Sequence, residues 1–289
     1  MANELGEFLR SRRARVRPEQ AGLPTYGERR RVEGLRREEV ALLAGVSVPY
    51  YVRLEQGRAG NVSAEVLNAV ARVLGLDDTE RAHLHDLARP ATDKTVTRAR
   101  PTAETVTREP VRPTVKRVLD SLADTPAFVM GRRTDMLACN RLASLLFWNR
   151  PTPPDGPLNC ARLVFLDEHT RTLFRDWDDK ARETVAFLRL DAGRHPDDRE
   201  LAALVGELSV KSVDFRRLWA EHEVRERSAG RVTLDHPLAG ELFLDYESLR
   251  PGAHADQVLV TYLAQPGSRT EEALRFLASW HAAEAVREV

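Results

Sequence analysis

The sequence predicts a protein of two domains, an all-α domain at the N-terminus followed by a domain of mixed α and β structure. The chain has 289 residues, whereas a single domain usually has about 100–200. Residues 1–90 carry apolar side chains at helical spacing, and residues 112–289 alternate between helix-like and strand-like patterns. Between them, residues 91–111 are rich in Thr, Pro and Arg without an apolar period, which is typical of a linker.

The first domain is predicted to contain five short helices. In the first helix, Leu5, Phe8 and Leu9 recur at the spacing of one helical face. Pro18 and Gly22 then interrupt the pattern and begin a loop that carries three consecutive arginines. The predicted helices are residues 4–17, 36–44, 47–56, 63–74 and 78–88.

The second domain is predicted to have an α+β fold. Helices are expected over residues 114–123, 139–148 and 269–280, with long helical segments after the proline-rich loop 151–157. Strands are expected over residues 127–130, 135–138, 231–235, 241–246 and 257–263. The turn Pro237–Gly240 between two of these strands predicts a hairpin.

Composition restricts the class of protein. Hydrophobic residues make up 42% of the chain and charged residues 30%, as in globular proteins. No stretch approaches the ~18 continuous apolar residues of a membrane span, and the N-terminus lacks the features of a secretory signal. The two cysteines, Cys139 and Cys160, are too few for a disulfide framework. We therefore expect a cytoplasmic protein with reduced thiols and no membrane partner.

Charge is distributed unevenly, although the formal net charge is zero. Between Arg10 and Arg58, twelve arginines stand against six acidic residues, so this stretch carries +6 and the rest of the chain −6. A basic segment joined to an acidic remainder indicates that one part of the protein meets phosphates. An ordinary solvated charged surface is the alternative interpretation.

Residues 35–58 match the spacing that a helix-turn-helix requires. Ala41 is a small residue where the two helices would touch, and Gly45 can adopt the positive φ that ends the first of them. Ser47 can cap the second helix. The apolar anchors of the second helix would be Val46, Tyr51 and Leu54. This combination predicts a DNA-binding motif.

The motif resembles the lambda-repressor-like, XRE-type helix-turn-helix, and the similarity extends from about Leu5 to Leu87. The resemblance implies that the second helix of the motif reads double-stranded DNA, with a two-pronged contact from Arg53 to guanine. It also implies that Glu55 pairs internally with Arg13. Arg37 replaces a glutamine that is common at the start of the first helix, which favours phosphate contact over base reading. The implied base-reading residues are Val48, Pro49, Tyr50 and Arg53, and the implied phosphate-binding residues are Arg36, Arg37, Gln56 and Arg58.

The second domain resembles the ligand-binding domain of the MmyB-like regulators of actinobacteria, which has a PAS-like fold. The resemblance implies an apolar pocket for a small, fatty-acid-like effector and no further cofactor. It rests on Pro126–Arg133, Asn140–Ala143, Asn159–Leu166, Asp176–Trp177, Val205–Ser209, Phe215–His222 and Gly240–Tyr246.

Aromatic side chains on the faces of the predicted elements are candidates for lining such a pocket. Sensor pockets are mostly apolar with a few polar groups that fix the ligand, although most aromatic residues at such positions simply form the core. Candidates to hold the polar head of a ligand are Asn140, Arg182 and His222. The aromatic candidates are Trp148, Trp177, Phe215, Trp219, Tyr246 and Tyr262.

The sequence gives no signature of an enzyme. It has no glycine-rich phosphate loop, nucleophile elbow or metal-ligand spacing. His83 and His85 would point about 200° apart on a helix and would not share a metal. The Asp235-His236 pair near Tyr246 has no accompanying nucleophile. We therefore expect a protein that is not an enzyme.

Together these features predict a sequence-specific transcription regulator whose affinity for an operator responds to a small ligand. A single helix-turn-helix reads only a few base pairs, so we expect a homodimer that binds two half-sites about 34 Å or a multiple of that apart. The alternative is a DNA-binding regulator whose second domain only dimerises or binds a partner protein.

Overall fold

The structure, a computed structural model, describes residues 4–23, 32–89, 110–150, 152–225, 228–250 and 256–287. The chain divides into two compact units. Unit 1 consists of Met1–Glu104, Arg189–Asp198 and Trp219–Arg225, and unit 2 consists of Thr105–Leu188, Arg199–Leu218 and Glu226–Val289. Most of the predicted linker (91–109) and the arginines at 29–31 lie outside the described residues.

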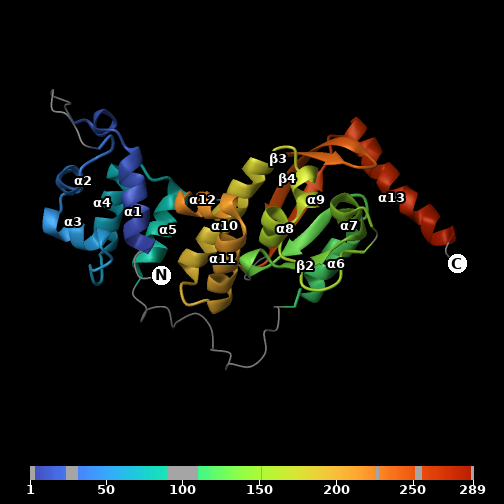
Figure 1. The fold of residues 1–289 in the computed structure, drawn as a ribbon, viewed down its shortest axis with the longest axis horizontal. Helices are drawn as coiled ribbons and strands as arrows, with labels where there is room; N and C mark the ends of the chain where they lie inside the picture. Colours follow the sequence, from blue (N-terminus) through green and yellow to red (C-terminus); the bar gives the residue numbers. More distant parts are fainter. Residues whose placement is uncertain are drawn as a thin grey trace. The chain divides into compact units, whose positions relative to one another are not determined.

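The N-terminal part of unit 1 forms five α-helices within its described residues, as predicted (Figure 1). They are α1 (Glu4–Arg15), α2 (Arg37–Ala44), α3 (Val48–Glu55), α4 (Ala64–Val73) and α5 (Asp78–Ala88). Helix α1 packs against α3 and α5, and α2 packs against α3 and α4. A short 3-10 helix, η1 (Pro18–Ala21), lies where the sequence predicted only a loop. Proline suits its first turn because the N–H there has no helical partner.

The predicted caps determine where these helices begin and end. Gly45 has φ of 68° at the end of α2, in the left-handed region that glycine adopts without steric cost. The Ser47 hydroxyl accepts a hydrogen bond from the N–H of Tyr50 at 3.3 Å and so caps α3. Ser63 caps α4 in the same way. The turn between α2 and α3 is therefore fixed by local interactions.

The hydrophobic core of unit 1 includes residues from distant parts of the chain. Phe8, Leu9 and Leu84 are buried in it, as expected for a helical bundle. Leu190 and Val224 belong to the same cluster, with exposed fractions of 4% and 3%. Leu190 lies in α10 (Trp177–Arg194), and Val224 follows α12 (Val213–Ala220). Two short segments far along the sequence thus complete the core around the N-terminal helices.

Unit 2 contains an antiparallel five-stranded sheet within the described residues, with the order β2-β1-β5-β4-β3. The strands are β1 (Ala127–Met130), β2 (Met136–Cys139), β3 (Ala229–His236), β4 (Gly240–Leu249) and β5 (Val258–Leu263). The predicted hairpin joins β3 and β4, where His236 pairs with Gly240. Gly240 has φ of 71°, which suits a three-residue hairpin loop that ends in the left-handed region.

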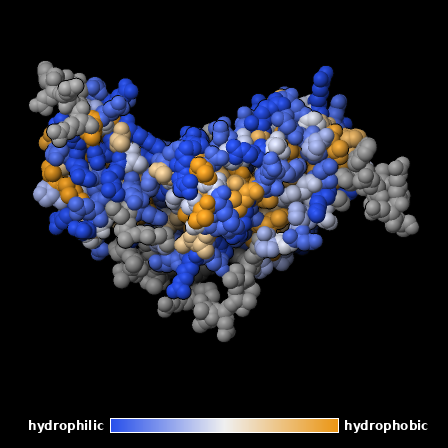
Figure 2. Space-filling view, in the orientation of Figure 1, coloured by the Kyte–Doolittle hydropathy of each residue, from blue (hydrophilic) through white to orange (hydrophobic). Residues whose placement is uncertain are grey.

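The sheet buries one face of its outer hairpin. Along β4, Leu242, Leu244 and Tyr246 are buried, whereas Phe243 and Asp245 between them are exposed. This alternation follows from the two-residue period of a strand. The surface seen in Figure 2 is mostly hydrophilic, with separate apolar patches.

Helices pack around this sheet in unit 2. Helices α6 and α7 contact β1, and α13 contacts both β4 and α7. The helices not yet given are α6 (Pro113–Ser121), α7 (Arg141–Trp148), α8 (Cys160–Leu166), α9 (Glu168–Leu173), α11 (Arg199–Lys211) and α13 (Arg269–Arg287). The predicted fold class, an all-α first domain followed by an α+β second domain, is confirmed.

Candidate DNA-binding surface and ligand-binding region

Helix α3 presents two different faces. Tyr51, Leu54 and Glu55 are buried against the rest of unit 1. Pro49 and Arg53 are exposed on the opposite side. The exposed face of α3 therefore presents the cationic side chain of Arg53 to solvent, and Pro49 lies in the first turn of the same helix.

The other two predicted base-reading residues are less exposed than Pro49 and Arg53. Tyr50 is half-buried, and the guanidinium carbon of Arg53 lies 5.8 Å from the centre of its ring. Val48 packs partly against the core of unit 1. Of the four candidates, Val48 is thus the one that also serves the fold, and base contact by any of them stays a prediction.

Glu55 holds α3 in place from the buried side of the helix. Its carboxylate is 1% exposed, and Oε1 accepts a hydrogen bond from Nε of Arg13 in α1 at 2.8 Å. The same Arg13 donates through Nη1 to the carbonyl of Leu35 at 2.8 Å. The predicted internal pair of Glu55 with Arg13 is confirmed. A buried carboxylate needs such partners, because desolvating an unpaired charge is costly.

Arg37 also binds this carboxylate, which the sequence did not predict. Its Nε donates to Oε2 of Glu55, and this contact raises the pKa of Arg37 above its ordinary value. The Arg37 side chain remains 42% exposed at the start of α2. It can therefore position Glu55 and still meet solvent or a phosphate.

The remaining candidates for phosphate contact lie at two helix ends. Arg36 is half-buried immediately before α2, where its backbone N–H donates to Oε2 of Glu39 at 2.6 Å. Gln56 and Arg58 are exposed directly after α3. Their contact with phosphate stays a prediction.

The predicted pocket residues of unit 2 divide between two aromatic groups. In the first group, the ring of Phe147 lies 5.9 Å from that of Trp148 and 5.3 Å from that of Tyr262, and Tyr246 lies 6.2 Å from Tyr262. This group, the aromatic cluster, consists of Phe128, Phe147, Trp148, Phe174, Tyr246 and Tyr262.

The second group lies around α8. Phe165 contacts Trp177 at 5.9 Å and Phe215 at 5.1 Å between ring centres, both edge to face. The indole N–H of Trp177 donates to the carbonyl of Val164 at 2.8 Å. The guanidinium of Arg171 lies 3.8 Å from the centre of the Trp177 ring. Trp177 and Phe215 therefore have structural partners that account for their positions.

Lys180 places a positive charge beside the aromatic cluster, and the sequence did not single it out. Its ammonium lies 5.8 Å from the centre of the Phe174 ring and 6.0 Å from that of Tyr246. Burial lowers the pKa of Lys180, but Glu183, whose carboxylate lies 3.5 Å away, together with Tyr262, Cys160 and Tyr246 raises it by more, so the net pKa lies above its ordinary value. Lys180 lies in α10, three residues after Trp177.

Trp219 and His222, which were grouped with the pocket residues, belong to unit 1. There the guanidinium of Arg189 lies 4.1 Å from the Trp219 ring centre and donates to Nδ1 of His222 at 3.0 Å. Arg182 is half-buried in α10 and belongs to unit 2. The predicted pocket residues thus do not all belong to one unit.

Asn140 uses its side chain to hold the backbone. Its amide nitrogen donates to the carbonyls of Leu122 and Thr125, at 2.8 and 2.7 Å. Its amide oxygen accepts from the N–H groups of Ala127 and Ala143, at 3.1 and 2.9 Å, and the second of these bonds caps α7. Because all four bonds are made, this side chain has little capacity left for a ligand.

Replacing Asn140 by alanine should destabilise the protein by about 2–4 kcal/mol, because a helix cap is lost and buried backbone groups lose their partners. Thermal unfolding of the full chain measures this. Asn140→Asp keeps the cap but lacks the donor, and is expected to fall between the wild type and the alanine variant. An alanine variant as stable as the wild type would contradict the structural role.

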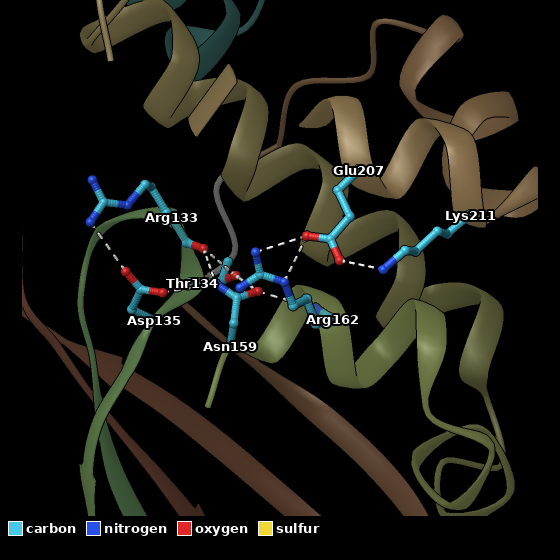
Figure 3. Close-up of polar contacts among 7 residues, drawn as sticks. All are labelled: Arg133, Thr134, Asp135, Asn159, Arg162, Glu207 and Lys211. Carbon is cyan, nitrogen blue, oxygen red and sulfur yellow. Dashed lines mark hydrogen bonds and ion pairs between the residues drawn. The ribbon is translucent and has the colours of Figure 1, made fainter. Parts of the chain in front are cut away.

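A polar network supports α8 in unit 2 (Figure 3). The side chain of Asn159 donates to the carbonyl of Arg133 at 2.7 Å and to Oδ1 of Asp135 at 3.0 Å. Arg133 and Thr134 have φ of 56° and 63°, a left-handed conformation that costs energy for residues with a Cβ. The Thr134 hydroxyl accepts from the N–H of Ala161 at 3.1 Å. These bonds hold the strained turn between β1 and β2 against the start of α8.

The same network extends to α11. Arg162 donates through Nε and Nη2 to Oε2 of Glu207, at 3.0 and 2.8 Å, and Lys211 lies 2.9 Å from the other carboxylate oxygen (Figure 3). Arg133 forms an ion pair with Glu200 at 2.8 Å. The charges of this region are therefore paired with one another, which indicates a structural role.

Three further features of the described part of the chain bear on what it can bind. No group of three or more His, Cys, Asp or Glu residues there is arranged to hold a metal. No described helix is both long and apolar enough to cross a membrane. Cys139 and Cys160 are free thiols, and burial raises the pKa of each to about 11.

Comparison with protein-family models agrees with this architecture. Residues 4–84 match a helix-turn-helix domain. Residues 111–277 match the MmyB-like transcription regulator ligand binding domain, which covers more than half of the chain. A comparison with curated proteins finds no match. The chain therefore belongs to the MmyB-like transcription regulators, with a helix-turn-helix DNA-binding domain followed by a ligand-binding domain.

Proposed function

We propose that this regulator binds an operator in double-stranded DNA as a homodimer, and that a small, apolar, fatty-acid-like ligand changes its affinity for the operator. The observation that carries the DNA-binding part is the two-faced helix α3. Its inner face is held by the buried Glu55, and its outer face exposes Arg53. A helix held in this way is suited to enter a major groove.

Base reading and phosphate binding are assigned to different residues. The planar guanidinium of Arg53 matches the two acceptors on the major-groove edge of guanine. The phosphate-binding groups are assigned to two places beside Arg53. They are Gln56 and Arg58, which are exposed after α3, and Arg36 and Arg37 at the start of α2. Val48, Pro49 and Tyr50 complete the surface of the first turn.

The ligand is assigned to unit 2 on the basis of the aromatic cluster. Apolar rings provide the contact that a hydrocarbon chain needs, and a small number of polar groups give a pocket its specificity. The ammonium of Lys180 beside Phe174 and Tyr246 supplies a charge that complements an acidic head group. A ligand of this chemistry would act by binding the two states of the regulator with different affinity.

Native mass spectrometry of the freshly purified protein, followed by organic extraction, tests the ligand and the oligomeric state together. A dimer that carries a discrete additional mass, extracted as an acyl chain or similar small molecule, supports the proposal. A dimer with no additional mass, which also fails to bind any member of a panel of fatty acids, favours a second domain that only dimerises or binds a partner protein.

Arg53→Ala should relax the preference for one base pair and weaken binding by about 1–3 kcal/mol, because one base contact is lost. Selection of duplexes from a random pool by the wild-type protein first defines the operator. Binding of both proteins to that duplex and its single-base variants then measures the preference.

Arg58→Ala is the matched control. It should weaken binding to all duplexes alike and reduce the slope of log affinity against log salt by about 0.9, since one phosphate contact is lost. An Arg53→Ala variant with the base-preference profile of the wild type would show that Arg53 does not read bases.

A further inference from the structure

Two segments from the region matched to the ligand-binding family are integral to the unit that carries the DNA-binding helices. These segments, Arg189–Asp198 and Trp219–Arg225, are called the clamp. Leu190 and Val224 of the clamp are buried in the same core as Phe8 and Leu84 of α1 and α5. Burial of apolar side chains is the main favourable term in such a contact.

Polar contacts from α1 reinforce this packing. Arg12 is only 3% exposed, and its Nη2 donates to the carbonyl of His222 in the clamp at 2.6 Å. The Nε atom of Arg12 lies 2.8 Å from Oε1 of Glu80 in α5. One turn further along α1, Arg15 donates to the carbonyl of Glu221 at 3.2 Å. The buried guanidinium of Arg12 needs its acceptors, and the clamp supplies one of them, while a second clamp carbonyl binds the exposed Arg15.

The clamp itself is ordered by Arg189. This side chain stacks on Trp219 and donates to the imidazole of His222 and to the Trp219 carbonyl. Arg189 and Trp219 come from different clamp segments, so their contact joins the two segments.

Gly193 brings the clamp into direct contact with α5. A Cβ at this position would lie 2.6 Å from both Cε1 and Nδ1 of His83, closer than real Cβ contacts. His83 is 2% exposed and packs edge to face on Phe8, with 5.2 Å between ring centres. The ring therefore lies between Gly193 of the clamp and Phe8 of α1. Only glycine allows this approach.

We propose that the clamp is an intramolecular docking surface on α1 and α5, and that its docking raises the affinity of α3 for DNA. The route is short. Arg12 binds the clamp, and the next residue of α1, Arg13, binds Glu55 beneath α3. Docking restricts the motion of α1 and, through it, of α3. Less conformational entropy is then lost when α3 binds DNA. This inference rests on the proposed DNA-binding function.

Gly193→Ala tests the proposal through a steric clash. In a helix, alanine in place of glycine is normally stabilising, but here it meets His83. Hydrogen exchange of the full chain should be at least about tenfold faster for amides of the clamp, and affinity for the duplex selected by the wild type should fall about tenfold. The preference among single-base variants should not change, because no base-reading residue is altered.

Two further variants test whether the effects of Gly193→Ala come from the clash with His83. His83→Ala combined with Gly193→Ala removes the clash and should restore slow exchange and affinity towards wild-type values. Gly206→Ala lies in α11, where an added Cβ meets no atom within 4 Å. This control should alter neither measurement.

The two measurements separate the ways in which the proposal can fail. Unchanged exchange in Gly193→Ala would overturn the docking contact. Faster clamp exchange with unchanged affinity would overturn the link from docking to DNA binding. If the wild type selects no duplex, the proposed DNA binding fails and the link fails with it, while exchange still decides whether the clamp is docked.

Discussion

Replacing Glu55 by alanine should destabilise unit 1 by about 3–5 kcal/mol, the cost typical of removing one partner from a buried charge pair. The variant leaves Arg13, whose side chain is 15% exposed, without its carboxylate, and it removes the partner of Arg37. Arg37 contributes less to the loss because solvent reaches it. Urea unfolding of the full chain, followed by circular dichroism, measures the effect.

Glu55→Gln is the matched control, because glutamine keeps the shape of the glutamate side chain and removes its charge. The amide retains one acceptor oxygen for a single arginine, so its cost should be clearly smaller than that of the alanine variant. Weak DNA binding should accompany the loss of stability in both variants, since Glu55 fixes α3 from its buried side. An alanine variant within about 1 kcal/mol of the wild type, a typical effect for any point mutation, would contradict the anchoring role.

Acidification should destabilise unit 1 through His83. Burial, followed by the charges of Arg189, Arg12 and Arg194 and by His222, lowers the pKa of His83 from 6.5 to about 3. The neutral imidazole is therefore favoured in the folded state. Below pH 6.5 the unfolded chain binds a proton that the folded chain does not, so stability present above this pH is lost as the pH falls towards 3.

The expected loss from His83 alone is about 2 kcal/mol between pH 7 and pH 5. His222 adds to it in the same direction, because burial and the charge of Arg189 lower its pKa to about 4. Urea unfolding at the two pH values measures the sum. His83→Leu should remove the larger part of the pH dependence. His85→Gln, which replaces a histidine of the same helix whose Nε2 lies 3.0 Å from Oδ1 of Asn68, is the matched control. Equal pH dependence in wild type and His83→Leu would refute this origin.

The N-terminal helices could be predicted because their signals are local. Ser47 caps the helix that it was expected to cap, and Gly45 ends α2 with a positive φ. The pairing of Glu55 with Arg13 followed from the family resemblance. The strand-like runs of the sequence likewise located the strands of unit 2, with boundaries that differ by at most three residues.

The clamp could not be predicted because it depends on contacts between residues far apart in the chain. Arg12 and His222 are separated by 210 positions, and no local pattern connects them. Phe215, Leu218, Trp219 and His222 share a helical spacing, yet α12 ends at Ala220 and His222 has φ of 52°. His222 therefore does not continue the helical face of the other three residues.

The network around Asn159 and the charge of Lys180 were missed for a related reason. Asn159 stands in a stretch that carries the family resemblance, but its role depends on a turn 25 residues earlier. Lys180 looks like an ordinary surface residue of an amphipathic helix until Phe174 and Tyr246 are brought beside it. Polar groups of this kind carry no periodicity, so only the tertiary structure reveals their partners.

The raised pKa values of Cys139 and Cys160 make both thiols poor nucleophiles. With a pKa of about 11, only about one thiol in 10⁴ is ionised at pH 7, and the thiolate is the form that reacts with peroxides and alkylating agents. Regulation by oxidation of these residues is thus disfavoured. The native chain is also a suitable background for spectroscopy, because a cysteine introduced at an exposed position such as Pro49 would react with a maleimide label before either native thiol.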